Sequence, residues 1–214
     1  MILYLHGFRS SPNSYKSRLM ATELQKRNLA HQWFGPQLPA SPAQAIALCN
    51  EIIQQQIDTQ ALKPEQDLVI IGSSLGGYYA AVLAERWNCR SVLLNPAVHA
   101  ARDLATQVGT HTQYHSDAPF HFLPEYVDEL AAMQPQKPAN PQRCLLVAAK
   151  GDELLDWREM VAWYKDSHVL LLEGSDHGIS DFEQYLPQVL DFALSPDTAQ
   201  YANPTPDSAP TTRP

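Results

Sequence analysis

Short apolar runs alternate along this chain with longer segments in which apolar residues recur every three or four positions. The runs have the length and composition of buried β-strands, and the segments between them match amphipathic helices. Strands that alternate with helices in this way build a mostly parallel sheet with helices on both faces. We therefore expect an α/β fold, with strands at residues 1–5, 31–34, 67–71, 91–95, 144–149 and 168–172 and helices at residues 14–28, 41–59 and 75–87.

Three helix starts carry residues that favour capping. Asn13 or Ser14 precedes the first helix, Ser41 followed by Pro42 opens the second, and Asp156 precedes a later one. Side-chain oxygens of these residue types accept hydrogen bonds from the free N–H groups of a first helical turn, where proline is also tolerated. These positions therefore support the helix assignments.

The alternation lapses between residues 97 and 140, where we expect a small cap segment over the site. A short helix is expected at residues 124–133, with Glu125, Asp128 and Glu129 on a solvated face. Aromatic residues of the segment are candidates for an acyl-binding wall, and ordinary packing of the cap on the sheet is the alternative. These aromatic residues are Tyr114, Phe120, Phe122 and Tyr126.

The same segment contains three histidines, His111, His115 and His121. Histidine is a common zinc ligand, but the sequence Asp117-Ala118-Pro119 interrupts any helix that would align these side chains. We therefore expect neither a metal site nor a cofactor.

The composition changes after Leu194. Residues 195–214 contain five prolines, few apolar residues and no periodicity, so they cannot bury enough apolar surface to offset the entropy lost on ordering. We expect a single domain over residues 1–194 and a flexible proline-rich tail over residues 195–214, with a partner-docking peptide as the alternative for the tail.

Composition limits the classes of protein to consider. The 214 residues are 44% hydrophobic, enough for one domain with a sizeable core. A net charge of −8 without a basic cluster argues against nucleic-acid binding. We see neither a signal-peptide pattern nor an apolar run long enough to span a membrane. The widely spaced Cys49, Cys89 and Cys144 suggest neither a metal motif nor a disulfide framework, so free thiols in a reducing cytoplasm are expected.

The most informative segment is LVIIGSSLGGYYAAVLA at residues 68–84. A GxSxG pattern between a strand and a helix is typical of a nucleophile elbow, whose sharp turn requires small neighbours. Ser73 does not fit this pattern, because Ile71 and Leu75 stand where it would need glycines. We therefore predict Ser74 as the nucleophile.

Two later strands are each followed by a residue that such a serine requires. In this arrangement the acid and then the histidine follow the serine along the chain. Asp152 comes after the strand at 144–149, and His177 comes after the strand at 168–172. Since the carboxyl ends of parallel strands meet at one edge of a sheet, these side chains can approach each other. We expect His177 to take the serine proton and Asp152 to fix the imidazole tautomer.

Other carboxylates compete for the role of the acid. They are Glu153, Asp156 and Asp176. Asp176 is adjacent to His177 in the chain, where the two side chains rarely face each other, and Asp156 is better explained as a helix cap. Asp152 is favoured, and the others stay as alternatives.

Acyl transfer also requires donors for a developing oxyanion. The N–H of Leu75, at the start of the helix after Ser74, is one candidate. The second is the N–H of Phe8, in the loop His6-Gly7-Phe8 that follows the first strand, and the Phe8 side chain would then line the acyl pocket. His6 is better explained as a structural residue that braces this loop than as a general base.

Five motifs occur in order along the chain: YLHGFRSSP at residues 4–12, IGSSLGGYYA at 71–80, LLNPAV at 93–98, GDELLD at 151–156 and GSDHG at 174–178. Together they resemble the small bacterial YqiA-type esterases of the α/β-hydrolase superfamily, from Met1 to about Leu194. The resemblance implies an intracellular carboxylesterase or thioesterase with Ser74, Asp152 and His177 as its triad. The tail after Leu194 and Lys150 before the Gly-Asp pair depart from the family pattern.

These observations predict an enzyme with a compact α/β-hydrolase fold, which cleaves a small acyl ester or thioester through an acyl-serine intermediate. Two early antiparallel strands of larger superfamily members have no counterpart in the sequence. The alternatives are an acyltransferase of the same fold and a non-catalytic, hydrolase-like binding protein. A lost triad residue or a spoiled elbow would favour the binding protein, and neither is seen.

Overall fold

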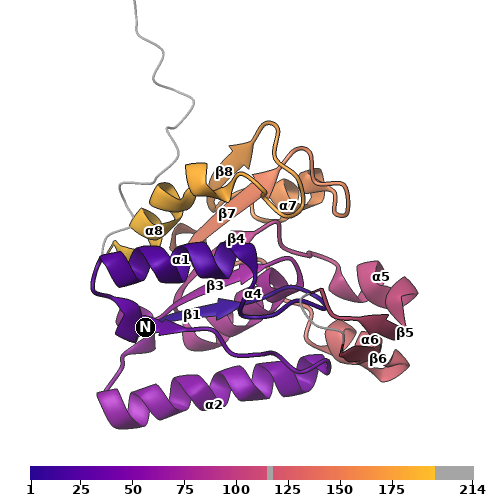
Figure 1. The fold of residues 1–214 in the computed structure, drawn as a ribbon, viewed down its shortest axis with the longest axis horizontal. Coiled ribbons are helices and arrows are strands. Elements are labelled where there is room, and N and C mark those ends of the chain that lie inside the picture. The colour runs from indigo at the N-terminus through magenta and orange to yellow at the C-terminus, as the bar shows by residue number, and fades with distance from the viewer. Residues whose placement is uncertain (115–117, 196–214) are drawn as a thin grey trace, which may run out of the picture.

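Six parallel strands form one sheet in the order β2-β1-β3-β4-β7-β8 (Figure 1). The fold is that of a computed structural model, which describes residues 1–114 and 118–195. The strands are β1 (Ile2–Leu5), β2 (Trp33–Phe34), β3 (Val69–Ser73), β4 (Arg90–Leu94), β7 (Cys144–Ala149) and β8 (His168–Leu172). The predicted mostly parallel sheet is therefore confirmed.

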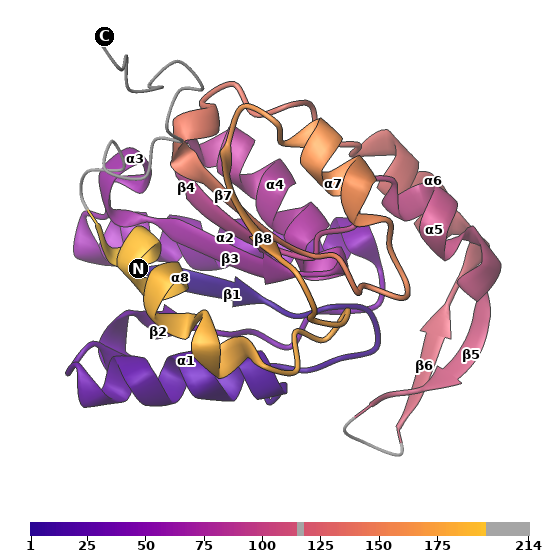
Figure 2. The ribbon, with the colours of Figure 1, turned by 90° about the horizontal axis from the view of Figure 1, so that it is seen from above.

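Helices cover both faces of the sheet (Figures 1 and 2). One face carries α1 (Tyr15–Lys26) and α8 (Leu186–Leu194), and the other carries α2 (Pro42–Gln60), α4 (Leu75–Trp87) and α7 (Trp157–Trp163). Alternate residues of each strand enter the two cores: in β1, Ile2 and Tyr4 face the first group of helices, and Leu3 and Leu5 face the second. Because both faces are buried, the strands read as continuous apolar runs.

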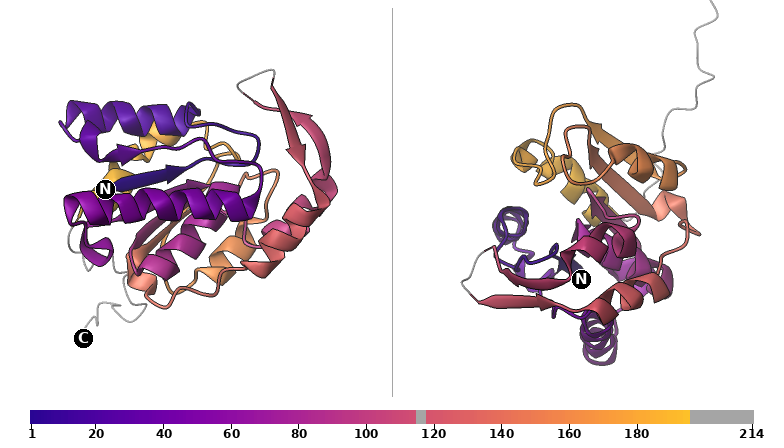
Figure 3. Two further views of the ribbon diagram at one scale, coloured as in Figure 1. Left: turned by 90° about the horizontal axis from the view of Figure 1, so that it is seen from below. Right: turned by 90° about the vertical axis from the view of Figure 1, so that its right-hand side faces the viewer.

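The connection from β4 to β7, residues 95–143, adds structure at the carboxyl end of the sheet. It contains α5 (Ala100–Leu104), the 3-10 turn η2 (Ala105–Gln107), an antiparallel hairpin of β5 (Gly109–Thr112) and β6 (Pro119–Phe122), and α6 (Pro124–Ala132). Figures 2 and 3 show the hairpin standing beside the sheet on the side toward which the strands run. The sequence did not predict this hairpin, because its four-residue strands are largely exposed and show no clear alternation.

Most predicted boundaries agree with the structure to within about two residues, and β7 and β8 have the predicted bounds. Ser41 caps α2 by accepting a hydrogen bond from the N–H of Gln44 (3.2 Å), and Asp156 caps α7 through the N–H of Arg158 (2.9 Å). Besides the β5–β6 hairpin, α5 and η2, the short elements not predicted include α3 (Pro64–Asp67) and the 3-10 turns η1 (Ala30–Gln32), η3 (Pro141–Arg143) and η4 (Phe182–Gln184).

Two predictions concern residues outside the described part of the chain. They are the histidine His115 and all but the first residue of the tail predicted at 195–214. None of the described helices combines the length and apolar character needed to cross a membrane.

Candidate active site

Ser74 lies at the turn between β3 and α4, with φ 56° and ψ −120°. A positive φ is unusual for a residue with a Cβ atom and marks local backbone strain. The turn is held at both ends, because the Ser74 N–H donates to the Leu94 carbonyl at 3.0 Å and its carbonyl accepts from the N–H of Gly77 at 2.9 Å. The predicted elbow conformation is therefore present.

The glycines of the elbow are required by close backbone contacts. A Cβ atom on Gly72 would lie 2.0 Å from the Gly76 carbonyl oxygen, and one on Gly76 would lie 2.0 Å from the Leu5 carbonyl oxygen. Both separations are far below van der Waals contact, so larger residues would push β3, α4 and β1 apart.

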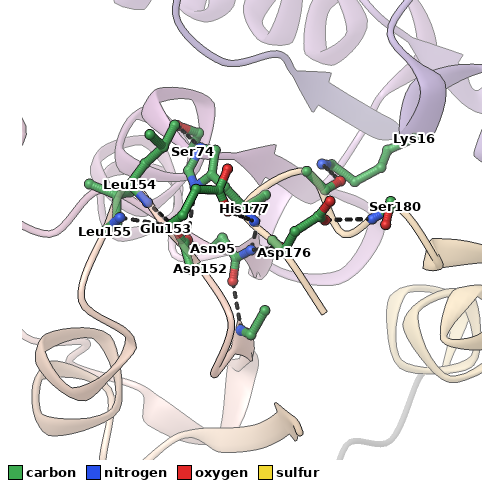
Figure 4. A network of polar contacts seen from close by, with 12 residues as sticks. Lys16, Ser74, Asn95, Asp152, Glu153, Leu154, Leu155, Asp176, His177 and Ser180 are labelled. Atoms are coloured by element: carbon green, nitrogen blue, oxygen red, sulfur yellow. Dashed lines mark hydrogen bonds and ion pairs between the residues drawn. The ribbon is translucent and has the colours of Figure 1, made fainter. Parts of the chain in front are cut away.

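His177 lies between Ser74 and Asp152 (Figure 4). Its Nε2 is 3.0 Å from Ser74 Oγ, and its Nδ1 is 2.8 Å from Asp152 Oδ2. The Asp152 side chain is fully buried, whereas 15% of the His177 side chain is exposed. The structure thus brings together three predicted residues that lie on the loops after β3, β7 and β8.

Backbone groups position the Asp152 carboxylate. Its Oδ1 accepts hydrogen bonds from the N–H groups of Leu154 at 2.9 Å and Leu155 at 2.8 Å, which leaves Oδ2 facing His177. Each oxygen therefore has a partner that fixes the plane of the carboxylate.

The other carboxylates considered as the acid have different partners. Glu153 accepts from the backbone N–H of His177 at 3.0 Å, and Asp156 caps α7. Asp176 accepts from the Ser180 N–H at 2.8 Å, and this hydrogen bond lowers the pKa of its carboxyl. In the described structure, Asp152 is the carboxylate that contacts the imidazole ring.

Asn95, at the end of β4, fastens the histidine loop to the sheet. Its Nδ2 donates to the carbonyl oxygens of Asp176 and His177, both at 3.0 Å, while its Oδ1 accepts from the Ala149 N–H at 2.8 Å. The side chain is fully buried and the backbone is left-handed, with φ 41°. Asn95 is the last residue of a strand predicted from the sequence, and a polar side chain at the carboxyl end of a buried strand is the signal that could have identified it.

The loop after β1 lies against the serine. A Cβ atom on Gly7 would be 3.2 Å from Ser74 Cβ, and Phe8 and Leu75 line the same cavity as Ser74. Within the described residues, neither the Phe8 nor the Leu75 N–H donates to another protein group. The oxyanion role of these two N–H groups stays a prediction, and their lack of a protein acceptor among the described residues is compatible with it.

His6 holds this loop from behind. It is 4% exposed, its Nδ1 lies 3.0 Å from the Gly7 carbonyl oxygen, and its Nε2 accepts from the Leu38 N–H at 3.0 Å. Since Nε2 is an acceptor, the ring carries its proton on Nδ1 and donates it to Gly7. These contacts agree with a bracing role for His6.

A cavity of about 530 Å³ opens beside the serine. Its lining includes Tyr15 and Lys16 of the first turn of α1, together with Leu104, Leu154 and Leu155. The sequence did not identify these lining residues, because α1, α5 and the loop after β7 meet only in the folded chain.

The predicted aromatic residues divide between cavity and core. Tyr114 lines the cavity, with the Arg9 guanidinium 4.8 Å from its ring centroid. Phe120 and Phe122 instead pack edge-to-face on Phe8 at centroid distances of 5.1 Å. Tyr126 in turn contacts Phe122 at 5.7 Å. The Phe8 ring therefore packs the β5–β6 hairpin against the loop after β1.

The prediction that Glu129 lies on a solvated face was wrong. Its Oε2 accepts hydrogen bonds from Ser41 Oγ at 2.8 Å and from the Ala43 N–H at 2.9 Å, at the start of α2. A carboxylate is favourable there, because free N–H groups point out of the helix end. Glu129 thus links α6 to α2, whereas Glu125 and Asp128 are exposed.

The histidines of the β4–β7 connection have local partners. His111 Nε2 lies 2.6 Å from the Gln107 carbonyl oxygen, and His121 Nδ1 lies 3.0 Å from Thr110 Oγ1. Across the described ranges, no three His, Cys, Asp or Glu side chains form a group that could hold a metal ion.

Comparisons with known proteins identify relatives over nearly the whole chain. The model of an uncharacterised protein family, UPF0227, matches residues 1–194. The UPF0227 protein VP0969 of Vibrio parahaemolyticus is 22% identical over 194 residues, which cover 90% of this chain and 98% of the relative. The UPF0227 protein YE1706 of Yersinia enterocolitica is 25% identical over 200 residues, with the same coverage.

Solved structures share the fold at low sequence identity. Est1E from Butyrivibrio proteoclasticus, with ferulic acid bound, superposes with a TM-score of 0.67 at 14% identity, covering 90% of this chain and 87% of that one. The Pyrococcus furiosus esterase Pf2001 gives a TM-score of 0.60 at 16% identity, covering 89% and 80%. The α/β-hydrolase fold expected from the sequence is therefore confirmed.

Proposed function

The chain belongs to the uncharacterised protein family UPF0227, and from that premise and the geometry of its site we propose that it is a serine hydrolase of carboxylic esters or thioesters. The observation that carries the proposal is the hydrogen-bonded series Ser74–His177–Asp152, with distances of 3.0 and 2.8 Å. Such a series supplies a nucleophile, its general base and the group that orients the base.

The proposed reaction has two halves. Ser74 Oγ attacks the acyl carbonyl carbon as His177 Nε2 takes the hydroxyl proton, and the carbonyl oxygen becomes an oxyanion facing the Phe8 and Leu75 N–H groups. Collapse breaks the bond to the alcohol or thiol, which leaves with the proton from His177. Water, activated by the same imidazole, then releases the acid and restores Ser74.

We also propose that the β4–β7 connection acts as a cap that selects substrates. Its residues Leu104, Gln107 and Tyr114 line the cavity, which supports this role. A cytoplasmic location, a single domain over residues 1–194 and the flexible tail stay predictions from the sequence. Subcellular fractionation and activity of a chain truncated after Ser195 would test them.

Hydrolysis of 4-nitrophenyl esters from acetate to palmitate, and of matched thioesters, tests the proposal. Ser74→Ala should lower turnover by about 10⁴-fold or more, and Ser73→Ala, which changes the adjacent serine, should stay active. A fluorophosphonate should label the wild type on the peptide that contains Ser74. Folded wild-type protein that neither turns over any of these esters nor becomes labelled would contradict the proposal and favour a binding protein.

A further inference from the structure

Lys16 is a buried cation without a carboxylate partner at contact distance. It is the second residue of α1, is 8% exposed, and its Nζ donates to the carbonyl of Gly178, 162 residues away in the chain. Within the described residues, no carboxylate oxygen lies within 4.0 Å of this Nζ. Buried ammonium groups are normally paired with an anion, because removing the charge from water is costly.

The two carboxylates that attract Lys16 make their hydrogen bonds with other groups. Asp176 and Asp152 attract the ammonium only at longer range, while Asp176 accepts from the Ser180 N–H and Asp152 contacts His177. In Figure 4, Lys16 lies on the same side of His177 as Asp176. The single carbonyl acceptor occupies one of the three N–H donors of the ammonium, so two are left for another group.

Lys16 lines the same cavity as Ser74 and His177. The start of α1 meets the cavity at this point, with no acidic residue in its first turn and no side-chain cap from Ser14. Ser14 Oγ instead lies 3.3 Å from the hydroxyl of Tyr4. Free N–H groups at a helix start favour a bound anion, and the Lys16 ammonium adds to this attraction.

Arg9 also lines the cavity. Arg9 donates from Nε at 2.8 Å and from Nη2 at 2.5 Å to the Thr112 carbonyl, and it lies over the ring of Tyr114. Among the described residues, both cations on the cavity thus donate to a backbone carbonyl, but Arg9 is partly exposed to water whereas Lys16 is buried.

We propose that Lys16 and the first turn of α1 bind a carboxylate of the substrate, so that the preferred substrate is an ester or thioester that bears a second, anionic group. The inference rests on the proposed hydrolase function and specifies its substrate class. Burial lowers the pKa of Lys16 to about 8, so the ammonium is mostly charged at neutral pH.

Substrate pairs in which a carboxylate is replaced by a neutral ester or amide test the proposal in two arms. For the acyl side, mono(4-nitrophenyl) adipate is compared with its methyl ester. For the leaving-group side, 4-acetoxybenzoate is compared with 4-acetoxybenzamide, and spontaneous hydrolysis is subtracted throughout. The measured quantity is the ratio of kcat/KM for the charged and neutral members.

We expect the wild type to prefer the charged member about tenfold or more in one arm, which corresponds to about 1.4 kcal/mol. Lys16→Met should bring this ratio close to one, and Lys16→Arg should retain most of it. Lys150→Met is the matched control, because it removes the same charge from a lysine that does not line the cavity and is paired with Glu173. This variant should leave the ratio of kcat/KM values unchanged.

Two results would overturn the inference. One is a wild type without a charge preference in either arm, and the other is Lys16→Met lowering both members of a pair in the same proportion, as a purely structural role requires. If Lys16→Met does not fold, the inference is tested by the kcat/KM ratio of the wild type and by that of Lys16→Gln. Ser74-dependent turnover without a charge preference defeats only this inference, whereas absence of both turnover and Ser74 labelling defeats the proposed function itself.

Discussion

Asn95 ties His177 to the central sheet: its side-chain amide donates to the His177 carbonyl at 3.0 Å while its oxygen accepts from Ala149 at the end of β7. Asn95→Asp keeps the acceptor and the shape but places a carboxylate against two carbonyl oxygens. We expect the free energy of unfolding to fall by about 2–4 kcal/mol and kcat to fall at least tenfold (about 1.4 kcal/mol). Denaturant titration and ester turnover measure these effects.

Asn88→Asp is a matched control for this change. Asn88 also has a left-handed backbone, with φ 46°, but it is exposed at the end of α4. We expect Asn88→Asp to change the free energy of unfolding by no more than about 0.5 kcal/mol. If both variants lost similar stability, the effect would come from the left-handed backbone rather than from the link to His177.

Asp152→Asn should remove most activity without unfolding the protein. An amide in place of the carboxylate cannot stabilise an imidazolium and favours the wrong tautomer of His177, so kcat should fall by about 10³–10⁴-fold. Asp156→Asn, at the capping position of α7, should lower turnover by no more than about threefold, since asparagine caps helices nearly as well. Comparable losses in both variants would mean that the acid is assigned to the wrong residue.

Gly76→Ala should prevent stable folding. Its Cβ atom would lie 2.0 Å from the Leu5 carbonyl oxygen and 2.6 Å from that of His6, and both contacts are with backbone. We expect the free energy of unfolding to fall by about 3 kcal/mol or more, which would be seen as insoluble protein or a much lower Tm. Gly174→Ala, where no atom lies within 4 Å of the added Cβ, should leave Tm nearly unchanged; a normal Tm for Gly76→Ala would contradict the packing of the elbow on β1.

Stability should fall as the pH rises above about 9. Burial raises the pKa of Cys49 and Cys89 from 9.0 to about 12, and that of Cys144 to about 11. Burial also raises the pKa of Tyr4 from 10.0 to about 12. In the unfolded chain these groups lose protons near their ordinary pKa values, whereas the folded chain retains them, so stability declines from about pH 9 toward pH 12.

Lys16 opposes this trend over part of the range. Its folded pKa of about 8 lies below its ordinary value of 10.5, so the cost of burying the charge disappears between these values and stability from this group rises with pH. Denaturant titrations from pH 7 to 11 would measure the sum. Above pH 10, seven buried thiols and phenols with raised pKa values oppose the buried lysine, so a rise in stability there would contradict their burial. They are Cys49, Cys89, Cys144, Tyr4, Tyr78, Tyr79 and Tyr164.

Features encoded by neighbouring residues could be predicted from the sequence. The strands β7 and β8 are continuous apolar runs, and the elbow around Ser74 is a local pattern whose glycines have a steric cause. Asp152 and His177 followed from the same logic, because parallel strands deliver the residues after them to one edge.

Features that depend on distant contacts could not be predicted. Lys16 looks like an ordinary polar position in an amphipathic helix, and only its approach to Gly178 reveals its burial. Glu129 likewise reads as solvated until α6 meets the start of α2. The β5–β6 hairpin lacks alternation because its packing comes from Phe8, about a hundred residues earlier.

The parallel order of the sheet makes the site a reporter of complete folding. Phe8, Ser74, Asp152 and His177 follow β1, β3, β7 and β8, which no short hairpin connects, so every strand pairing between them must form before these groups meet. Non-local pairings of this kind form slowly, because the loop entropy is lost before the contacts are gained. The rate at which turnover recovers during refolding would therefore report the last step of sheet assembly. The fluorescence of single tryptophans would instead report local steps of that assembly.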